Sequence, residues 1–369
     1  MNYLRTKKTP DFSKQFIHGG ANFLQTKQNV SLDFSVNINP LGLMENVKKN
    51  LQEKIDSVIS YPDPNCTELT NALSAFRNIP RNQILFGNGA SDLIQTFVHA
   101  LFLRSAIIVE PSFSGYERSL LSVQCAIHRV RLFAENDFSF DDSILLAIEK
   151  IKPDAIFICS PANPYGKNFS LEQKKELIRV CKKTDTWIFF DECFLGFAED
   201  GWKTSAVQFF SEYNKIVVLD AFTKIFALPG LRLGMCFSPN TDLILKLKFF
   251  QSEWAVSSLA QCAGLACLSS LSDLDSYLLQ TRKLVKEEKE KFYKKFSDFG
   301  FTVFPSDANF LLFKADKNLS KMLLQKHQIL IRDCSLYFGL GEDFFRTAIL
   351  LPEQNEKLCS SILKCLEKK

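Results

Sequence analysis

A lysine and an arginine stand eight positions apart in a stretch that is otherwise small and apolar. The stretch is LDAFTKIFALPGLRLG, residues 219–234, and its cations are Lys224 and Arg232. A lysine amine can form a Schiff base with an aldehyde, and desolvation lowers its pKa enough to make it reactive. An arginine offers a planar fork of donors to a phosphate. The pair therefore points to chemistry rather than to packing, for which leucine would suffice.

Other polar groups follow predicted strands elsewhere in the chain. Backbone N–H groups at the start of a predicted helix, in GNGASD, would face an anion. A carboxylate in FFDECF would keep a pyridine nitrogen protonated, which makes the ring an electron sink. Together these groups predict a cofactor with an aldehyde, a ring nitrogen and a phosphate. They are Gly89, Ala90, Ser91, Asn163, Asp191, Lys224 and Arg232.

The elements that would position these groups are six short apolar runs between about residues 83 and 237. They alternate with helical patterns, which is typical of a mostly parallel α/β sheet flanked by helices. In such sheets ligands bind outside the carboxyl ends of the strands, so the loops that follow them should carry the chemistry. The runs are QILFG, SAIIVEP, DAIFICS, TWIFFDE, KIVVLDA and LRLGMCF.

The pattern changes beyond residue 270. The charged run 281–300 predicts one long solvated helix that stops at Gly300, and a smaller α+β unit begins after it. We therefore expect an N-terminal arm over 1–42, a large α/β domain over 43–270 and a small C-terminal domain over 271–369.

Composition excludes several classes of protein. A net charge of +4 over 369 residues does not suggest a nucleic-acid groove, although it suits small anionic ligands. Eleven cysteines without a CxxC pair, and four scattered histidines, favour reduced thiols and no metal site. The first sixteen residues lack the apolar core of a signal peptide, and no run is long enough to span a membrane. We expect a cytoplasmic protein that binds neither nucleic acid nor membrane.

The stretch FTKIFALPGLRLG, supported by SPANPYG and FFDECF, resembles the fold type I pyridoxal-phosphate enzymes of the class I/II aminotransferase superfamily. The resemblance covers nearly the whole chain. It is strongest to the threonine-phosphate decarboxylase branch of the cobalamin pathway, followed by the histidinol-phosphate aminotransferase branch. The segments that indicate these branches are HGG, DFSVNINPLG, YPDP, GNGASDLI, PSFSGYERSL, IRDCSLYFGL and FFRTAIL.

The resemblance implies pyridoxal 5'-phosphate as the cofactor, with Lys224 as the Schiff-base lysine and Asp191 on the ring nitrogen. It also implies a homodimer with composite active sites, in which Tyr61 reaches the cofactor phosphate of the other subunit. Phe113 would stack on the ring, Asn163 would bind its 3-oxygen, and Thr223 would lie in the cofactor site. The residues implied for a small phosphorylated amino-acid substrate are Arg346, Arg332, Asn37, His18 and Gly19.

The chain departs from the usual pattern at Ala221, where most relatives carry a serine or threonine that bonds the cofactor phosphate, and at Tyr165, where threonine is common. Three functions stay open. The first is decarboxylation of L-threonine O-3-phosphate or a similar substrate to an amino-alcohol phosphate. The second is transamination, as by a histidinol-phosphate aminotransferase, and the third is a catalytically silent binding or regulatory role. The HGG arm and Phe194 favour the first.

Overall fold

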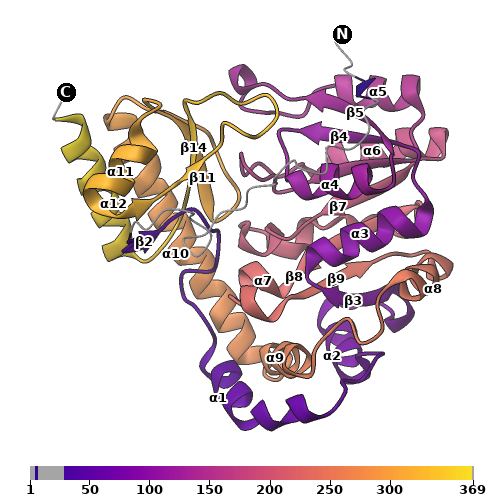
Figure 1. Ribbon diagram of the computed structural model, residues 1–369. Coiled ribbons are helices and arrows are strands. Elements are labelled where there is room, and N and C mark those ends of the chain that lie inside the picture. The colour runs from indigo at the N-terminus through magenta and orange to yellow at the C-terminus, as the bar shows by residue number, and fades with distance from the viewer. Residues whose placement is uncertain (1–4, 7–28, 368–369) are drawn as a thin grey trace.

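The computed structural model describes residues 5–6 and 29–367, and it shows a large and a small sheet (Figure 1). The large sheet has the strand order β1-β5-β4-β6-β7-β8-β9-β3. Strands β4 to β8 are parallel, whereas β9 runs antiparallel to both of its neighbours. This confirms the predicted fold class. The strands are β1 (Arg5–Thr6), β3 (Ile84–Asn88), β4 (Ser105–Glu110), β5 (Ala126–Arg131), β6 (Ala155–Cys159), β7 (Trp187–Asp191), β8 (Ile216–Ala221) and β9 (Leu233–Phe237).

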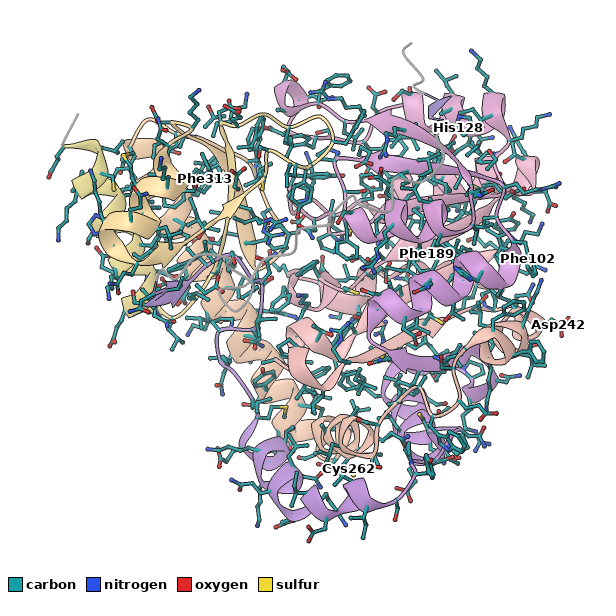
Figure 2. All side chains as sticks on the ribbon, viewed as in Figure 1. Phe102, His128, Phe189, Asp242, Cys262 and Phe313 are labelled. Carbon is teal, nitrogen blue, oxygen red and sulfur yellow. The ribbon has the colours of Figure 1, made fainter. Side chains whose placement is uncertain are left out.

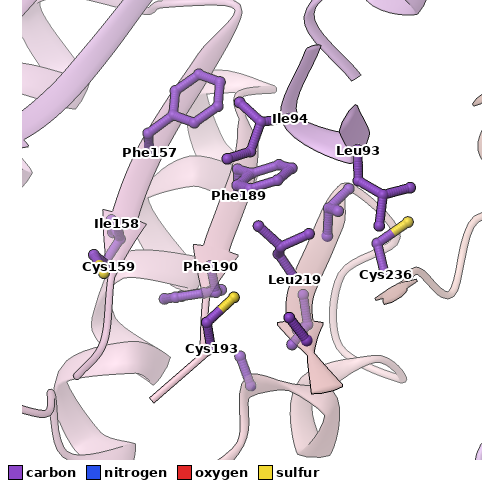
Figure 3. Packing of buried hydrophobic residues seen from close by; sticks show 14 of the residues in the cluster. Leu93, Ile94, Phe157, Ile158, Cys159, Phe189, Phe190, Cys193, Leu219 and Cys236 are labelled. Carbon is purple, nitrogen blue, oxygen red and sulfur yellow. The ribbon is translucent and has the colours of Figure 1, made fainter. Parts of the chain in front are cut away.

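Helices cover the large sheet, so its central strands are buried on both faces and are continuously apolar. Every residue of β6 and β8 is buried. Phe157 and Phe189, on adjacent strands, pack with ring centroids 5.2 Å apart near Ile94 of α3 (Figure 3). The helices up to residue 268 are α1 (Glu45–Glu53), α2 (Thr67–Arg77), α3 (Ala90–Leu101), α4 (Ser114–Ser122), α5 (Ser143–Ile151), α6 (Leu171–Thr184), α7 (Phe222–Ile225), α8 (Thr241–Phe250) and α9 (Ser258–Leu268).

Strand β5 was not among the six predicted runs, all of which form strands. Its sequence, AIHRVR, begins with two apolar residues but has polar residues at three of its last four positions, and these polar residues are partly buried or exposed. Helices α4 and α5 both contact this strand, but its polar residues break the continuous apolar run by which the other strands were recognised. Arg129 and Arg131 occupy polar positions in this strand.

The C-terminal part forms a four-stranded sheet in the order β10-β11-β14-β13. Alternate residues of β11 enter different cores: Phe310 and Leu312 join the large one, whereas Leu311 and Phe313 join a second core. Figure 2 labels Phe313 in the small C-terminal part. The segment β2 pairs in parallel with β12. The elements are β2 (Leu32–Asp33), β10 (Thr302–Val303), β11 (Phe310–Lys314), β12 (Ile329–Leu330), β13 (Arg332–Asp333), β14 (Phe344–Ala348), α10 (Leu271–Asp298), α11 (Leu319–His327) and α12 (Pro352–Leu366).

Helix α10 links the two cores. It ends near Gly300 as predicted, but it begins at Leu271, ten residues before the charged run. Its solvated character holds only for the outer face. Leu278 and Val285 pack into the large core, and Phe292 and Phe296 pack into the second. The helix is therefore amphipathic, with a buried stripe along its whole length.

All eleven cysteines lie in the described part of the chain as free thiols, and all but Cys262 are buried. Within residues 5–6 and 29–367, no helix combines the length and the apolar character that crossing a membrane requires.

Candidate active site

The predicted site residues meet at one edge of the large sheet. Asp191 is the last residue of β7, and Lys224 lies in α7, directly after β8. Arg232 precedes β9 rather than following a strand. Because β9 is antiparallel, its first residues pair with the last residues of β8 and β3, so its amino end lies at the same edge. The charges of Arg346, Arg232 and Asp191 all act on Lys224, which shows that these groups are close together.

A glycine turn and a guanidinium group meet where α3 begins. Its N-cap, Gly89, has φ 79°, a left-handed conformation that glycine adopts without steric cost. A Cβ added to Gly89 would lie 2.4 Å from Nη2 of Arg232, and one added to Gly234 would lie 2.5 Å from the carbonyl carbon of Gly89. Ser91 and Arg232 are exposed. The turn therefore offers the N–H groups of Ala90 and Ser91, together with a guanidinium group, to an anion.

Asp191 is a buried carboxylate held by two donors. Tyr116 Oη donates to Oδ2 at 2.6 Å, and the N–H of Cys193 donates to Oδ1 at 3.1 Å. Burial raises the pKa of Asp191, and both hydrogen bonds act against that increase. Among the described residues no lysine or arginine forms an ion pair with this carboxylate. A buried charge is normally paired, so this position fits a protonated ring nitrogen of a ligand.

The surroundings of Lys224 favour its neutral amine over its charged ammonium form. Its pKa is lowered from 10.5 to about 8, chiefly by burial and then by Arg346, with Arg232 adding to the effect. Its Nζ lies 5.9 Å from the ring centroid of Phe194, and no hydrogen bond joins it to another described residue. An amine with a lowered pKa can add to a carbonyl group near neutral pH.

The backbone around Lys224 is held by Asn39, a residue that the sequence reasoning missed in favour of Asn37. The N–H of Asn39 donates to the Lys224 carbonyl at 3.1 Å, and Nδ2 donates to the Ile225 carbonyl at 2.8 Å. The same amide donates to Thr281 Oγ1 of α10 at 2.8 Å. The Asn-Pro pair at 39–40 is a turn signal that could have identified it.

Arg346 and Arg332 form a cationic pair in the small sheet. They stand directly opposite each other on β14 and β13. Arg346 is buried and donates to Oδ1 of Asn163 and, at 2.7 Å, to the Ser35 carbonyl. Its Nε has no hydrogen-bond partner among the described groups. Like charges opposite each other are unfavourable, so the pair suits a shared anionic ligand such as a carboxylate.

Three further predicted residues, Phe113, Asn37 and Thr223, come from different elements of the fold. Phe113 precedes α4 and packs edge-to-face on Tyr116, with ring centroids 5.7 Å apart. Asn37 is buried, and its Oδ1 lacks a partner among the described groups. Thr223 is buried beside Lys224. Oδ1 of Asn37 is therefore an acceptor that a ligand could engage.

The structure does not bring one predicted residue together with the others, and two more lie outside the part of the chain that it describes. Tyr61 is 80% exposed and stacks on Trp254 with ring centroids 4.5 Å apart. It forms no hydrogen bond or ring contact with the site groups named above, as far as the described chain shows. His18 and Gly19 lie outside the described residues. Ala221 is buried at the end of β8 and brings no hydroxyl group to the edge.

The sequence reasoning also missed Tyr116 and Tyr337. Tyr116 follows Phe113 by three positions at the start of a helix, and residues at that spacing share one face. This spacing could have identified it. Tyr337 Oη donates to Oδ1 of Asn163 at 3.2 Å across 174 residues of sequence, a contact with no local signal.

Residues 30–362 match the family described as aminotransferase class I and II. The chain is 32% identical to threonine-phosphate decarboxylase of Salmonella typhimurium, over 95% of this chain and 96% of that protein. It is 29% identical to histidinol-phosphate aminotransferase of Thermoanaerobacter sp. strain X514, over 89% and 92% of the two chains. The crystal structure of histidinol-phosphate aminotransferase from Clostridium acetobutylicum superposes with a TM-score of 0.84 at 27% identity, covering 92% of this chain and all of that one. The chain belongs to the aminotransferase class I and II family.

Proposed function

We propose that this chain is a pyridoxal-phosphate enzyme that decarboxylates L-threonine O-3-phosphate, or a similar phosphorylated amino acid, to an amino-alcohol phosphate. The class I and II family depends on pyridoxal phosphate. The observation that carries the proposal is the buried Asp191 carboxylate, which has no cationic partner among the described residues, at the same sheet edge as a lysine with a lowered pKa. The similarity to a threonine-phosphate decarboxylase supports the reaction type.

The residues at this edge fit the cofactor group by group. Lys224 would hold its aldehyde carbon, Asp191 its ring nitrogen, and Asn163 its 3-oxygen. The Gly89–Ser91 turn and Arg232 would hold the phosphate, with Phe113 against the ring. When bound, the cofactor supplies a conjugated ring that accepts the electron pair of a bond broken at the substrate Cα.

The protein selects which bond breaks by how it holds the substrate. The bond perpendicular to the ring plane is the one whose electrons enter the conjugated system, so orientation decides the reaction. Arg346 and Arg332 would hold the carboxylate out of that plane, while the arm around His18 would hold the side-chain phosphate. Nζ of Lys224 would then deliver the proton that replaces the carboxylate at Cα.

Transamination is the second candidate. It is favoured by the similarity to histidinol-phosphate aminotransferases in sequence and in fold. If Arg346 holds the carboxylate near the ring plane instead, the Cα–H bond becomes the exposed one. A catalytically silent role is disfavoured because Lys224, Asp191, Asn163 and Arg232 are all present.

A label experiment separates the two reactions. O-phosphothreonine labelled in its carboxyl group, incubated with the holoenzyme and no keto acid, should release labelled CO2 over many turnovers. Lys224→Ala should release none above background. Retention of the label, with one-for-one conversion of the cofactor to its amine form, would reject decarboxylation and support the aminotransferase.

We infer further that the active unit is a homodimer, in which Tyr61 completes the partner's site. Val58, Ile59 and Tyr61 are 60%, 88% and 80% exposed, an apolar surface that supports a covered interface. An obligate interface would exceed roughly 2,000 Å², so an active monomer at assay concentration would contradict the inference.

Eleven free thiols support a reducing compartment, the cytoplasm. The domain division 1–42, 43–270 and 271–369 stays a proposal; it is supported by a second core that joins Phe34 to residues between Phe292 and Cys365, although Leu278 and Val285 of α10 pack into the large core.

A further inference from the structure

Residues 334–343, here called the strap, connect β13 to β14 and extend from the small sheet toward the large one (Figure 1). Two backbone hydrogen bonds shape its turns: the N–H of Tyr337 donates to the Cys334 carbonyl at 3.0 Å, and that of Leu340 donates to the Tyr337 carbonyl at 3.1 Å. The strap has no regular secondary structure, so contacts made by its side chains and carbonyl groups decide where it lies.

Two arginines of β5 hold the strap on the large sheet. Arg131 Nη2 donates to the Gly339 carbonyl at 2.6 Å. The guanidinium carbon of Arg129 lies 4.9 Å from the ring centroid of Phe338, a cation–π contact. Gly339 has φ 84°, and a Cβ there would lie 2.6 Å from Arg131 Nε. The close approach of the strap to β5 therefore requires glycine at this position.

Arg129 is itself fixed in place. It forms ion pairs with buried Glu110 and, at 3.0 Å, with Glu117 of α4. Its side chain is 9% exposed. Because Glu110 and Glu117 both pair with its guanidinium group, Arg129 is held in one position against the ring of Phe338. The strap is thus attached to the large sheet through two side chains of β5, Arg129 and Arg131.

At the other side of the strap, Tyr337 reaches the candidate active site. Its hydroxyl donates to Oδ1 of Asn163 at 3.2 Å, and Arg346 Nη1 donates to the same oxygen. Two donors on Oδ1 fix the orientation of the amide, so that Nδ2 must point away from both. The Tyr337 ring centroid also lies 5.8 Å from the guanidinium carbon of Arg332. Tyr337 thus contacts Asn163, which is proposed to bind the cofactor, and Arg332 of the cationic pair.

We propose that Tyr337 is a positioning residue whose hydroxyl orients the Asn163 amide, and that the seating of Phe338 on β5 keeps it there. The proposal deepens the proposed function and rests on it in one respect, namely that Asn163 faces the cofactor. A phenylalanine at 337 would keep the ring contact with Arg332 but would leave the amide with one donor fewer. If the proposal holds, loss of the Phe338 contact with β5 should weaken the hydrogen bond between Tyr337 and Asn163.

The test compares holoenzymes carrying Tyr337→Phe, Phe338→Ala and both changes, with Leu336→Ala as the control. Leu336 lies on the strap but is 70% exposed. Two measurements are made: the pH titration of the absorbance of the bound cofactor, and KM and kcat for the substrate. The titration needs no substrate, so it reports on Tyr337 whichever reaction the enzyme performs.

We expect Tyr337→Phe to move the titration midpoint upward, because a less well oriented Asn163 amide stabilises the deprotonated 3-oxygen less. We also expect it to lower kcat/KM about 3- to 10-fold, the usual effect of one lost hydrogen bond. Phe338→Ala should cause part of both effects without touching Asn163, and the double variant should resemble Tyr337→Phe. Leu336→Ala should match wild type. An unchanged titration in Tyr337→Phe, or additive effects in the double variant, would overturn the proposal.

Discussion

Replacing Tyr116 with phenylalanine removes one hydroxyl group from the site and leaves the ring in place. The hydroxyl donates to Oδ2 of buried Asp191 at 2.6 Å, so its loss leaves a carboxylate oxygen without that donor. A hydrogen bond to a charged group contributes roughly 1.5 to 3 kcal/mol. We expect the free energy of unfolding of the cofactor-free protein to fall by about that amount at pH values above the raised pKa of Asp191, where the carboxylate is ionised.

The loss should depend on pH in a definite direction. Burial raises the pKa of Asp191 above its ordinary 3.8, so the fold loses stability as pH rises from 3.8 to the raised pKa, and the loss is complete above it. Tyr116 opposes that destabilisation, and removing its hydroxyl raises the pKa further. Toward lower pH the carboxyl group becomes protonated and receives only a neutral hydrogen bond from Tyr116. The loss in Tyr116→Phe should therefore shrink as pH falls through the raised pKa of Asp191.

Urea unfolding followed by tryptophan fluorescence at several pH values between 5 and 8 measures this difference. Tyr213→Phe is the matched control, because the buried Tyr213 hydroxyl donates to neutral backbone carbonyls of Thr186 and Cys181, at 2.9 and 3.3 Å. That variant should lose roughly 0.5 to 1.5 kcal/mol, independently of pH over this range. Equal, pH-independent losses in the two variants would refute the reasoning about Asp191.

The rate at which cofactor-free protein captures pyridoxal phosphate should rise with pH through about 8 and then level off, because only the neutral Lys224 amine adds to the aldehyde; a rise that continues toward 10.5 would contradict the lowered pKa. Gly234→Ala should weaken cofactor binding at least 10-fold in an absorbance titration, because its Cβ would meet the backbone of the turn before α3, whereas Gly230→Ala meets nothing within 4 Å and should bind normally. Lys174→Met leaves Glu192 buried and unpaired, and should lower the free energy of unfolding by about 3 to 5 kcal/mol. Adding Glu192→Gln should recover part of that loss in the same urea assay, and no recovery would count against an ion-pair origin.

The parts of the fold that the sequence predicted are those whose signal is local. The six buried strands were recognisable because a strand covered on both faces must be apolar along its whole length. Strand β5 escaped notice because Arg129 and Arg131 interrupt that pattern, and their contacts with the strap lie more than 200 residues away. The start of α10 was placed late because its first ten residues, LSDLDSYLLQ, precede the charged run from which the helix was predicted.

For the site, the sequence by itself determined which groups could do chemistry and at which strand ends they stand. Lys224 and Asp191 were identifiable because each follows an apolar run directly, and strand ends are where a sheet exposes polar groups to a ligand. The roles of Tyr61 and His18 stay predictions.

Only the tertiary structure decided how those groups are held and tuned. Antiparallel β9 brings Arg232 to the same edge as the others, and Asn39, Tyr116 and Tyr337 act through hydrogen bonds across long separations in sequence. Burial, which shifts the pKa values of Asp191 and Lys224, is likewise a property of the packed chain. The physical reason is the same in each case: residue type is a local property, whereas distance, desolvation and hydrogen-bond partners exist only once distant segments have packed together.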